Sequence, residues 1–521
     1  MGARVLPSSL HMAAVVVVAA LTMVATAAAA VAVEDSTTDN IQPLSTLKMQ
    51  AAQVAMDSGA VIHASPDVLG KNGEDSAWVT VNFTAPAPSA GHWVALFSPA
   101  DFGLSVGGGA RTNAAAGEEG PEAGLPTAPI KYMFANISPS FMSSGSGDMS
   151  SSSGNLSSGS GNMSFLVINQ RSDYAFGLFS GGKDNPKLIA VSNKISFANP
   201  KAPVFPRLSQ GKEWNEMAVT WTSGYNINEA YPFVEWKMKG GESSKRTPAG
   251  TLTYTRSHLC GASDGTNELA GFQPGAQGTT DRLIKDLPNY DAVFHIGDLS
   301  YANGFLAQWD QFTAQIEPIA SKVPYMVASG NHERTYHDTG VFYNGNDSRG
   351  ECGVPAETYF YAPAENRGKF RYAADYGMFR FCVGDTEHDW RPASEQHAFL
   401  DRCFASADRK HQPWLVFAAH RPLGYSSNDY YATEGSFSEP MGRTLQGLWQ
   451  KHRVDLAIYG HVHNYERTCP VYENTCMDGN KDKGSYSGTI HVVAGTGGAK
   501  LRDYSAGPWP QWSVVRDKSF G

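Results

Sequence analysis

Short runs of alternating apolar and polar residues fill the first part of the chain and predict an all-β domain over residues 43–200. The runs are separated by Gly, Pro and Ser clusters, a pattern typical of a β-sandwich, and they read AWVTVNF, GHWVALF, MSFLVI and YAFGLF. A Ser/Gly-rich stretch at 138–164 cannot bury an apolar face and predicts a flexible surface loop. A second β pattern over 201–262 is too short for a complete sandwich.

From about residue 280 onward the pattern changes to strands that alternate with helices. The segment FLAQWDQFTAQIEPIA places apolar residues at spacings of four and three, which predicts one apolar helix face. Five short apolar runs read as buried strands: YMVAS, MFRFCV, WLVFAA, VDLAIY and TIHVVA. Strands that alternate with helices predict an α/β domain over 280–521, in which helices cover the sheet.

Polar side chains follow three of these predicted strands and a further apolar run, VFHI (293–296), and such strand ends are where ligands collect in α/β domains. A single polar residue after a strand is more often a turn or cap residue. Four strand ends that converge on oxygen and nitrogen donors predict a metal site instead, with a donor set that suits iron, zinc or manganese. The donors are Asp298, Asn331, His332, Glu333, His420, His461 and His463.

The net charge of the 521-residue chain is −9, which argues against a nucleic-acid partner because no basic field is available to release phosphate counterions. A small phosphorylated substrate is compatible with this charge, since bound metal ions reverse the local field.

The N-terminus predicts a signal peptide over residues 1–32. Arg4 precedes an apolar run from Met12 to Val33, and small residues near Ala30 to Ala32 provide a cleavage site. The run is also long enough for an uncleaved anchor, which stays an alternative. No other segment has 18 consecutive apolar residues, so we expect no membrane span in the mature chain.

A secreted chain is expected to use its six cysteines in disulfides. The short loop between Cys469 and Cys476 predicts one bridge. A zinc site is the rival interpretation, although no Cys-x-x-Cys is present. The remaining cysteines are a candidate second pair, Cys382 and Cys403, and two without a local reason to pair, Cys260 and Cys352. Five glycosylation sequons fit secretion: Asn82, Asn136, Asn155, Asn162 and Asn346.

The motif order Gly-Asp-x-x-Tyr, Gly-Asn-His-Glu, Ala-Ala-His, Gly-His-x-His resembles the metallophosphoesterases, and within them the plant purple acid phosphatases. Tyr301, three residues after Asp298, is the specific feature. FPRLSQGKEWNEMAVTWTSGY looks like the fibronectin-like N-terminal module of that family. The leading β region and DTEHDWR (385–391) look like its larger plant members, some of which are described as nucleotide pyrophosphatase/phosphodiesterases.

The resemblance implies a binuclear metal centre, with Fe(III) beside Zn, Mn or Fe(II). Asp298 would bridge the two ions, with Tyr301 and His463 on the ferric ion. His332 would lie outside the metal shell and bind the phosphate or assist the leaving group. The divalent ion would be held by Asn331, His420 and His461, and weaker substrate-binding candidates are Glu333 and His388.

The implied fold is a metallophosphoesterase β-sandwich flanked by helices, preceded by immunoglobulin- or fibronectin-like β domains. The implied function is that of a secreted acid phosphatase in the cell wall or apoplast, with the vacuole left open. It would hydrolyse phosphomonoesters through a hydroxide held at the binuclear site. Nucleotide anhydrides or diesters stay open as further substrates. A homodimer is also left open.

Two departures from the family pattern favour an impaired member. The family has an Asp-x-Gly metal ligand upstream of Gly-Asp; here Ala262 joins Ser263 directly, which indicates a missing internal segment. Asp264 as a substitute ligand is the alternative. Near the substrate, where many members carry His, this chain has Asn-Asp-Tyr-Tyr at 428–431. Compensation by Glu387, His388 or Asp389 from their own loop is one alternative, and a charged surface turn is the expected interpretation of these three residues. A binding or regulatory protein is therefore the second hypothesis, and a carbohydrate- or protein-binding role of the N-terminal sandwiches the third.

Overall fold

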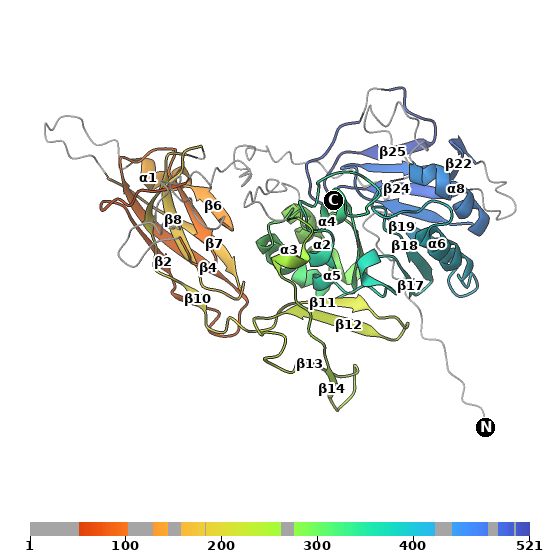
Figure 1. The fold of residues 1–521 in the computed structure, drawn as a ribbon, viewed down its shortest axis with the longest axis horizontal. Helices are drawn as coiled ribbons and strands as arrows, with labels where there is room; N and C mark the ends of the chain where they lie inside the picture. The colour runs from red at the N-terminus through yellow and green to blue at the C-terminus, as the bar shows by residue number, and fades with distance from the viewer. Residues whose placement is uncertain are drawn as a thin grey trace.

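The computed structural model describes residues 52–102, 129–143, 158–182, 184–261, 276–422, 440–477, 488–504 and 507–521. An all-β N-terminal domain, a short β region and a larger α/β domain follow one another across the molecule (Figure 1). The expected signal peptide lies outside the described residues. Among those that are described, no helix has the length and apolar character needed to cross a bilayer.

The N-terminal domain is a sandwich of a five-stranded and a three-stranded sheet, as the alternating pattern predicts. Val81, Phe83 and Phe176 are among the apolar side chains buried between the sheets. The five-stranded sheet has the order β1 (Gln53–Val54), β9 (Lys187–Val191), β8 (Ala175–Ser180), β5 (Trp93–Phe97) and β6 (Lys131–Phe134). The three-stranded sheet has the order β2 (Val61–Ser65), β4 (Ser76–Pro86) and β7 (Ser158–Ile168), and a separate parallel pair joins β3 (Val68–Leu69) to β10 (Ser196–Phe197).

The Ser/Gly-rich stretch differs from the expected loop where it is described. Its first part forms the short helix α1 (Pro139–Ser143), and its last part is the start of β7, which pairs with β4 along its whole length. A Cβ added at Gly159 would lie 2.4 Å from the carbonyl oxygen of Phe141. The small residues therefore allow α1 to pack closely on the strand, a tertiary reason that composition does not reveal.

The short β region contains two separate hairpins, in agreement with its expected lack of a complete sandwich. They pair β11 (Val204–Gln210) with β12 (Met217–Thr222), and β13 (Phe233–Trp236) with β14 (Lys245–Pro248). β11 packs on the α/β domain, where the buried Arg207 Nε donates to the carbonyl oxygen of Tyr359 at 3.0 Å. The side chains of β13 and β14 are mostly exposed, and in the part of the chain that the structure describes these two strands form a sheet of their own.

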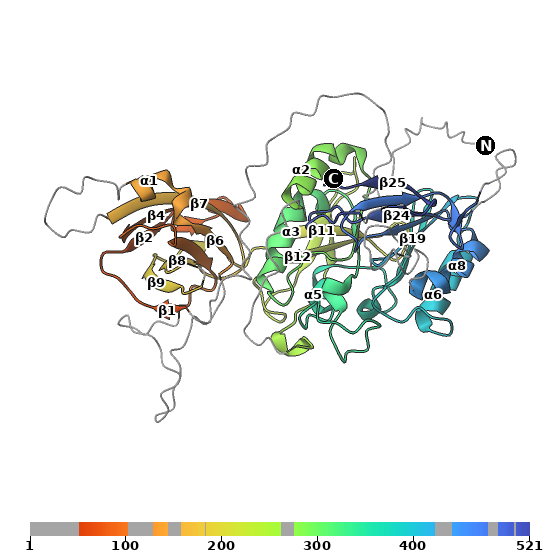
Figure 2. The same cartoon turned by 90° about the horizontal axis from the view of Figure 1, so that it is seen from above.

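The α/β domain has a seven-stranded mixed sheet and a parallel pair. Figure 2 shows this domain beside the N-terminal sandwich, seen from above. The larger sheet has the order β17 (Tyr372–Tyr376), β18 (Phe379–Val383), β19 (Trp414–Ala418), β20 (Leu456–Tyr459), β24 (Ile490–Ala494), β21 (Tyr465–Thr468) and β25 (Ser513–Asp517). The smaller sheets are β15 (Val293–Ile296) with β16 (Tyr325–Ala328), and β22 (Val471–Tyr472) with β23 (Thr475–Cys476). The helices are α2 (Ala276–Asp286), α3 (Ala307–Ala320), α4 (Asn331–Arg334), α5 (Val354–Tyr359), α6 (Glu395–Ala405) and α8 (Pro440–His452).

Two apolar cores divide this domain into layers. One lies between the β15–β16 pair, α3 and one face of the larger sheet, and includes Trp309, Phe294 and Phe381. The other lies between the opposite face of that sheet and helices α6 and α8, and includes Leu400 and Trp449. Two layers of sheet are thus enclosed by helices on both sides, as expected for the metallophosphoesterase architecture.

All six cysteines are paired. The Cys469–Cys476 bridge and the candidate Cys382–Cys403 bridge are both present. The two cysteines without a local reason to pair, Cys260 and Cys352, form the third bridge. They lie 92 residues apart in the sequence, so only the fold brings them together.

Candidate metal centre

The metal-site candidates come together at the carboxyl ends of four strands. Asp298 follows β15, Asn331 opens α4 after β16, His420 follows β19 and His461 follows β20. One ligand atom each from Asp298, His420 and His461 lies within 4.8 Å of the other two. β15 runs parallel to β16 in one sheet, and β19 runs parallel to β20 in the other, so the carboxyl ends of each pair lie together and residues far apart in sequence meet.

Asn331 lies at the centre of this cluster. Its Oδ1 is 3.0 Å from His420 Nε2 and 3.0 Å from His461 Nδ1. His420 Nε2 is also 3.1 Å from Asp298 Oδ2. Four donors from four strand ends therefore point toward one small volume.

Tyr301 and His463 form a second group that shares Asp298 with the first. The Tyr301 hydroxyl lies 3.2 Å from Asp298 Oδ2 and 3.1 Å from His463 Nε2. The arrangement separates the donors into the two sets that the resemblance implies, with Asp298 between them.

Backbone carbonyls fix the orientation of two imidazoles. His420 Nδ1 donates to the carbonyl oxygen of Ile296 at 2.8 Å, and His463 Nδ1 donates to that of Lys500 at 2.9 Å. With Nδ1 protonated, the Nε2 atom of each ring keeps its lone pair and points toward the cluster. This is the arrangement by which proteins select the tautomer of a metal-binding histidine.

The glycines that precede the donors are required by close packing. A Cβ added at Gly330 would lie 2.4 Å from Asp298 Oδ1, and one at Gly297 would lie 2.5 Å from His420 Nδ1. Asp298 and His461 themselves have φ values of 55° and 62°. Such left-handed backbone costs a non-glycine residue free energy and is concentrated at functional sites.

The cluster has a strongly perturbed electrostatic balance. Burial opposes ionisation of Asp298, but the neighbouring His420 and His332 outweigh it and hold the pKa of its carboxyl well below the usual range. Burial, together with the nearby Arg421 and His420, keeps the pKa of His461 well below that of a free imidazole. Burial and the charge of Asp298 raise the pKa of Tyr301. Burial opposes protonation of His420, but the Asp298 carboxylate outweighs it and raises the pKa of that imidazole. The Asp298 carboxylate is therefore anionic and favours positive charge in the cluster.

The chemistry of the donors fits a metal. Carboxylate, amide oxygen and imidazole donors in the first set suit a divalent zinc, manganese or iron ion. The second set, with Tyr301, His463 and the shared Asp298, offers a phenol oxygen for a harder ion but has one carboxylate fewer than the resemblance implies. Asp264, the alternative source of that carboxylate, lies outside the described residues.

His332 and Glu333 follow Asn331 but occupy different positions. The backbone N–H of His332 donates to Asp298 Oδ1 at 3.0 Å, and its Nδ1 lies 2.9 Å from Asn303 Oδ1. Glu333 is buried, and its carboxylate accepts backbone N–H groups from Asp298 at 2.8 Å and Leu299 at 2.7 Å. Glu333 therefore holds the Gly-Asp loop in place, whereas His332 borders the cluster without joining it.

His388, the other weak substrate-binding candidate, is bonded away from the cluster. Its Nδ1 lies 2.9 Å from the buried Asp385 Oδ2. The charged surface turn expected for Glu387, His388 and Asp389 is wrong for Glu387, which is fully buried. The exposed pair Asp389 and Arg391 does lie at the surface.

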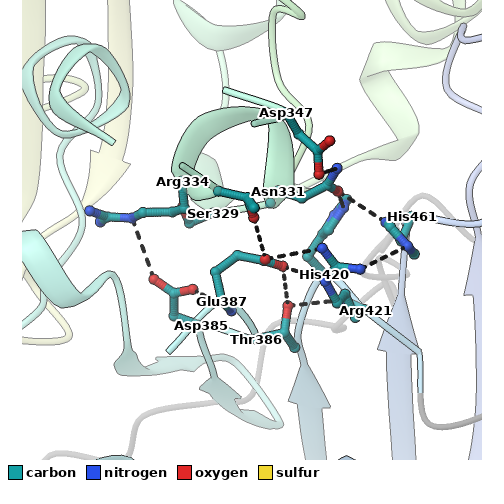
Figure 3. Close-up of polar contacts among 12 residues, drawn as sticks. Ser329, Asn331, Arg334, Asp347, Asp385, Thr386, Glu387, His420, Arg421 and His461 are labelled. Atoms are coloured by element: carbon teal, nitrogen blue, oxygen red, sulfur yellow. Dashed lines mark hydrogen bonds and ion pairs between the residues drawn. The ribbon is translucent and has the colours of Figure 1, made fainter. Parts of the chain in front are cut away.

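Figure 3 shows what Glu387 contacts: its carboxylate forms a two-pronged ion pair with Arg421, at 2.8 Å to Nε and 3.1 Å to Nη2. Arg421 Nη1 lies 3.3 Å from His461 Nε2, and its guanidinium lies 3.8 Å from the centre of the Tyr343 ring. Sequence reasoning missed Arg421, although its position directly after His420, at a strand end, was an available signal.

The glycosylation candidates that the structure describes are exposed: Asn82, Asn136, Asn162 and Asn346. Asn155 and residues 428–431 lie outside the described residues.

Comparisons with known proteins place both halves of the chain in one family. The profile of the Fn3-like domain from purple acid phosphatase matches residues 62–199, and that of the calcineurin-like phosphoesterase matches residues 258–465. The fibronectin-like match thus falls on the first β domain and not on 201–262, where the sequence resemblance was noted. The calcineurin-like family uses a binuclear metal centre, and Asp298, His420 and His461 form a group here that could hold a metal ion.

Individual relatives agree with these matches. "Probable inactive purple acid phosphatase 27" from Arabidopsis thaliana is 50% identical, with 92% of this chain and 87% of the relative covered. A "Nucleotide pyrophosphatase/phosphodiesterase" from Hordeum vulgare is 62% identical, with 50% of this chain and 71% of the relative covered. The solved purple acid phosphatase PPD1 from yellow lupin seeds is 48% identical and superposes with a TM-score of 0.77 over 89% of this chain and 91% of its own.

The alignment with the Arabidopsis relative runs over 555 residues, more than the 521 of the whole chain. The relative therefore contains internal residues that have no counterpart here, as the direct junction of Ala262 and Ser263 indicates. Identity and coverage over nearly the whole length nevertheless establish the relationship. The chain belongs to the purple acid phosphatase family.

Proposed function

We propose that this chain is a secreted, metal-dependent phosphoesterase that holds one divalent ion tightly and hydrolyses phosphomonoesters slowly. The observation that carries the proposal is the convergence of Asp298, His420 and His461 within 4.8 Å, with Asn331 between the two imidazoles. When bound there, a divalent ion supplies Lewis-acid polarisation of a phosphate oxygen and lowers the pKa of water.

The residues around the cluster support phosphate chemistry. His332 borders the cluster, and its Nδ1 is oriented by Asn303, so its Nε2 is the atom available to a phosphate oxygen or a departing alkoxide. A positioned imidazole contributes roughly 10²–10⁴-fold to such a step. Secretion is supported by the predicted leader, the exposed sequons and the three disulfides.

The second donor set is the reason for expecting slow turnover. Tyr301, His463 and the shared Asp298 supply only one carboxylate, and a trivalent ion loses more Coulomb attraction than a divalent one when an anionic ligand is missing. We therefore expect at most one tightly held ion and no purple colour near neutral pH. A phosphomonoester is the first substrate class to test, and the barley relative's name adds nucleotide anhydrides as a second.

A second candidate function is a binding or regulatory protein without hydrolytic activity. It is favoured by the description of the Arabidopsis relative as probably inactive and by the internal residues that this chain lacks.

Metal analysis together with hydrolysis of 4-nitrophenyl phosphate tests the proposal. The purified full chain should contain close to one divalent ion, and His420→Ala should lose both the ion and the residual hydrolysis. His337→Ala, at an exposed histidine outside the cluster, is the matched control and should change neither. A protein that binds no zinc, manganese or iron at micromolar concentration would reject the proposal in favour of the second candidate.

A further inference from the structure

The side-chain amide of Asn331 has to be turned one way to serve a cation. Its Oδ1 faces the cluster, 3.0 Å from both His420 Nε2 and His461 Nδ1. An amide turned end for end fills nearly the same space but presents N–H groups to those imidazole nitrogens. The N–H groups would then occupy the lone pairs that bind a metal ion. Whatever selects the orientation of this amide therefore controls the metal site.

Asp347 provides a partner that makes this selection. Asn331 Nδ2 donates to Asp347 Oδ2 at 2.9 Å, at the opposite end of the amide from Oδ1 (Figure 3). In the described part of the chain, this is the one hydrogen bond of that nitrogen. A carboxylate accepts hydrogen bonds and donates none, so it pairs with the amide nitrogen and repels the amide oxygen. The contact therefore favours the orientation in which Oδ1 faces the cluster.

The backbone around Asp347 is tied to the short helix that carries Asn331. The Ser348 N–H donates to the carbonyl oxygen of Thr335 at 3.0 Å, and the Thr335 N–H donates to that of Asn331 at 2.8 Å. Ser348 and Thr335 are both buried. A Cβ added at Gly345 would lie 2.9 Å from Thr335 Cγ2, so the glycine permits this close approach. These contacts hold the Asp347 carboxylate beside the amide.

Asp347 acts on the cluster from outside it. The ligand atoms that lie within 4.8 Å of one another come from Asp298, His420 and His461, and Asp347 contributes none. Its side chain is partly buried, so solvent screens its charge only in part. Attraction of a cation by this charge alone is the rival explanation of any effect that Asp347 has on metal binding.

We propose that Asp347 is a positioning residue of the metal centre, which fixes the Asn331 amide so that Oδ1, and not Nδ2, faces a divalent ion. Partners of this kind contribute roughly 10–100-fold to metal affinity. The inference rests on the metal binding of the proposed function. It adds a residue outside the strand-end motifs, next to the glycosylation candidate Asn346.

Zinc titration of the full chain, stripped of metal with EDTA and then freed of the chelator, measures the effect. Asp347→Asn should weaken zinc binding roughly 10–100-fold, because an amide donates as well as accepts and no longer selects one orientation. Asp338→Asn is the matched control and should leave the affinity unchanged, since the Asp338 side chain, in the same connection between α4 and α5, is 96% exposed. An unchanged affinity in Asp347→Asn would overturn the proposal.

An Asn331→Asp background separates orientation from charge. A carboxylate at this position has two equivalent oxygens, so it has no orientation to select. In this background Asp347→Asn should not weaken zinc binding, because the new amide can donate to the new carboxylate. A loss by the same factor as in the unmodified chain would show that Asp347 acts through its charge alone, and the proposal would be wrong.

A metal-free measurement distinguishes failure of this inference from failure of the proposed function. With isotope-labelled asparagine and EDTA present, the side-chain amide signal of Asn331 in nuclear magnetic resonance is the one that Asn331→Asp removes. Its hydrogen exchange with solvent should be about tenfold faster in Asp347→Asn, as expected on loss of a hydrogen bond to a charged group, and unchanged in Asp338→Asn. If the unmodified chain binds no zinc, the proposed function fails and this exchange decides the inference. Faster exchange in Asp347→Asn would support the orienting contact, and equal exchange in the two chains would overturn it.

Discussion

The buried ion pair between Glu387 and Arg421 gives the sharpest test of how the fold supports the metal-site residues. Glu387 is fully buried and Arg421 is 14% exposed at its side chain. The carboxylate also accepts the Thr335 hydroxyl at 2.7 Å and the Thr386 hydroxyl at 3.3 Å, and of these three hydrogen-bond partners Arg421 is the one that carries a charge. Burial lowers the pKa of Arg421, but the Glu387 carboxylate more than compensates, so the guanidinium stays charged.

The perturbations are Arg421→Met, Glu387→Gln and the double variant. Removing one partner of a buried pair leaves the other charge uncompensated and costs about 3–5 kcal/mol of unfolding free energy. The double variant removes both charges and should cost about as much as one single variant, so the coupling energy of the cycle should equal the cost of the other single variant, about 3–5 kcal/mol. Arg391→Met, which breaks the exposed pair with Asp389, is the control and should change stability negligibly.

The same variants should act on the metal site, because Arg421 Nη1 lies 3.3 Å from His461 Nε2. Its positive charge disfavours a cation on that imidazole, so Arg421→Met should tighten divalent-ion binding roughly tenfold, the factor that corresponds to about 1.4 kcal/mol. Urea unfolding followed by tryptophan fluorescence gives the stability cycle, and zinc titration gives the affinity. Additive single-variant costs, or weaker zinc binding by Arg421→Met, would refute this reasoning.

Three further predictions address other parts of the chain. His332→Ala should keep the divalent ion and slow hydrolysis by roughly 10²–10⁴-fold, because His332 borders the cluster without joining it; loss of metal on elemental analysis would contradict this. Replacing Cys260 and Cys352 by Ser should lower the unfolding free energy by about 4–5 kcal/mol in the chain-entropy account, because the bridge spans 92 residues. A smaller loss of unfolding free energy than on removal of the Cys469–Cys476 bridge, which spans 7 residues, would count against this account. Burial lowers the pKa of His491 to about 3. Between pH 6.5 and 3 the unfolded state therefore binds a proton that the folded state does not, and the unfolding free energy falls by about 1.4 kcal/mol for each unit by which the pH is lowered. His491→Gln should remove that part of the slope in urea unfolding at pH 7 and 4.5, and an unchanged slope would exclude His491 as its source.

Sequence reasoning was most successful where one residue type serves one local purpose. The order of short apolar runs, each followed by a small residue and a donor, predicted the edge at which Asp298, Asn331, His420 and His461 meet. It failed where partners are distant in sequence. The burial of Glu387 depends on Arg421, 34 residues away, and the Cys260–Cys352 bridge depends on the packing of a loop against the α/β domain. A Ser/Gly-rich composition likewise did not reveal that small residues at the start of β7 are needed for the approach of α1.

The close packing of Gly330 and Gly297 against the metal-site residues has a consequence for how this lineage can evolve. Backbone carbonyls, glycine contacts and left-handed turns orient the donors, so we expect the site to form without a bound ion. Small zinc domains differ, because they fold only with metal. A chelator should therefore abolish catalysis and leave the protein folded. Mutations that end catalysis need not trigger degradation, so a folded but inactive copy can persist. Such a copy is raw material for new binding roles, since selection can act on its surface while the scaffold is maintained.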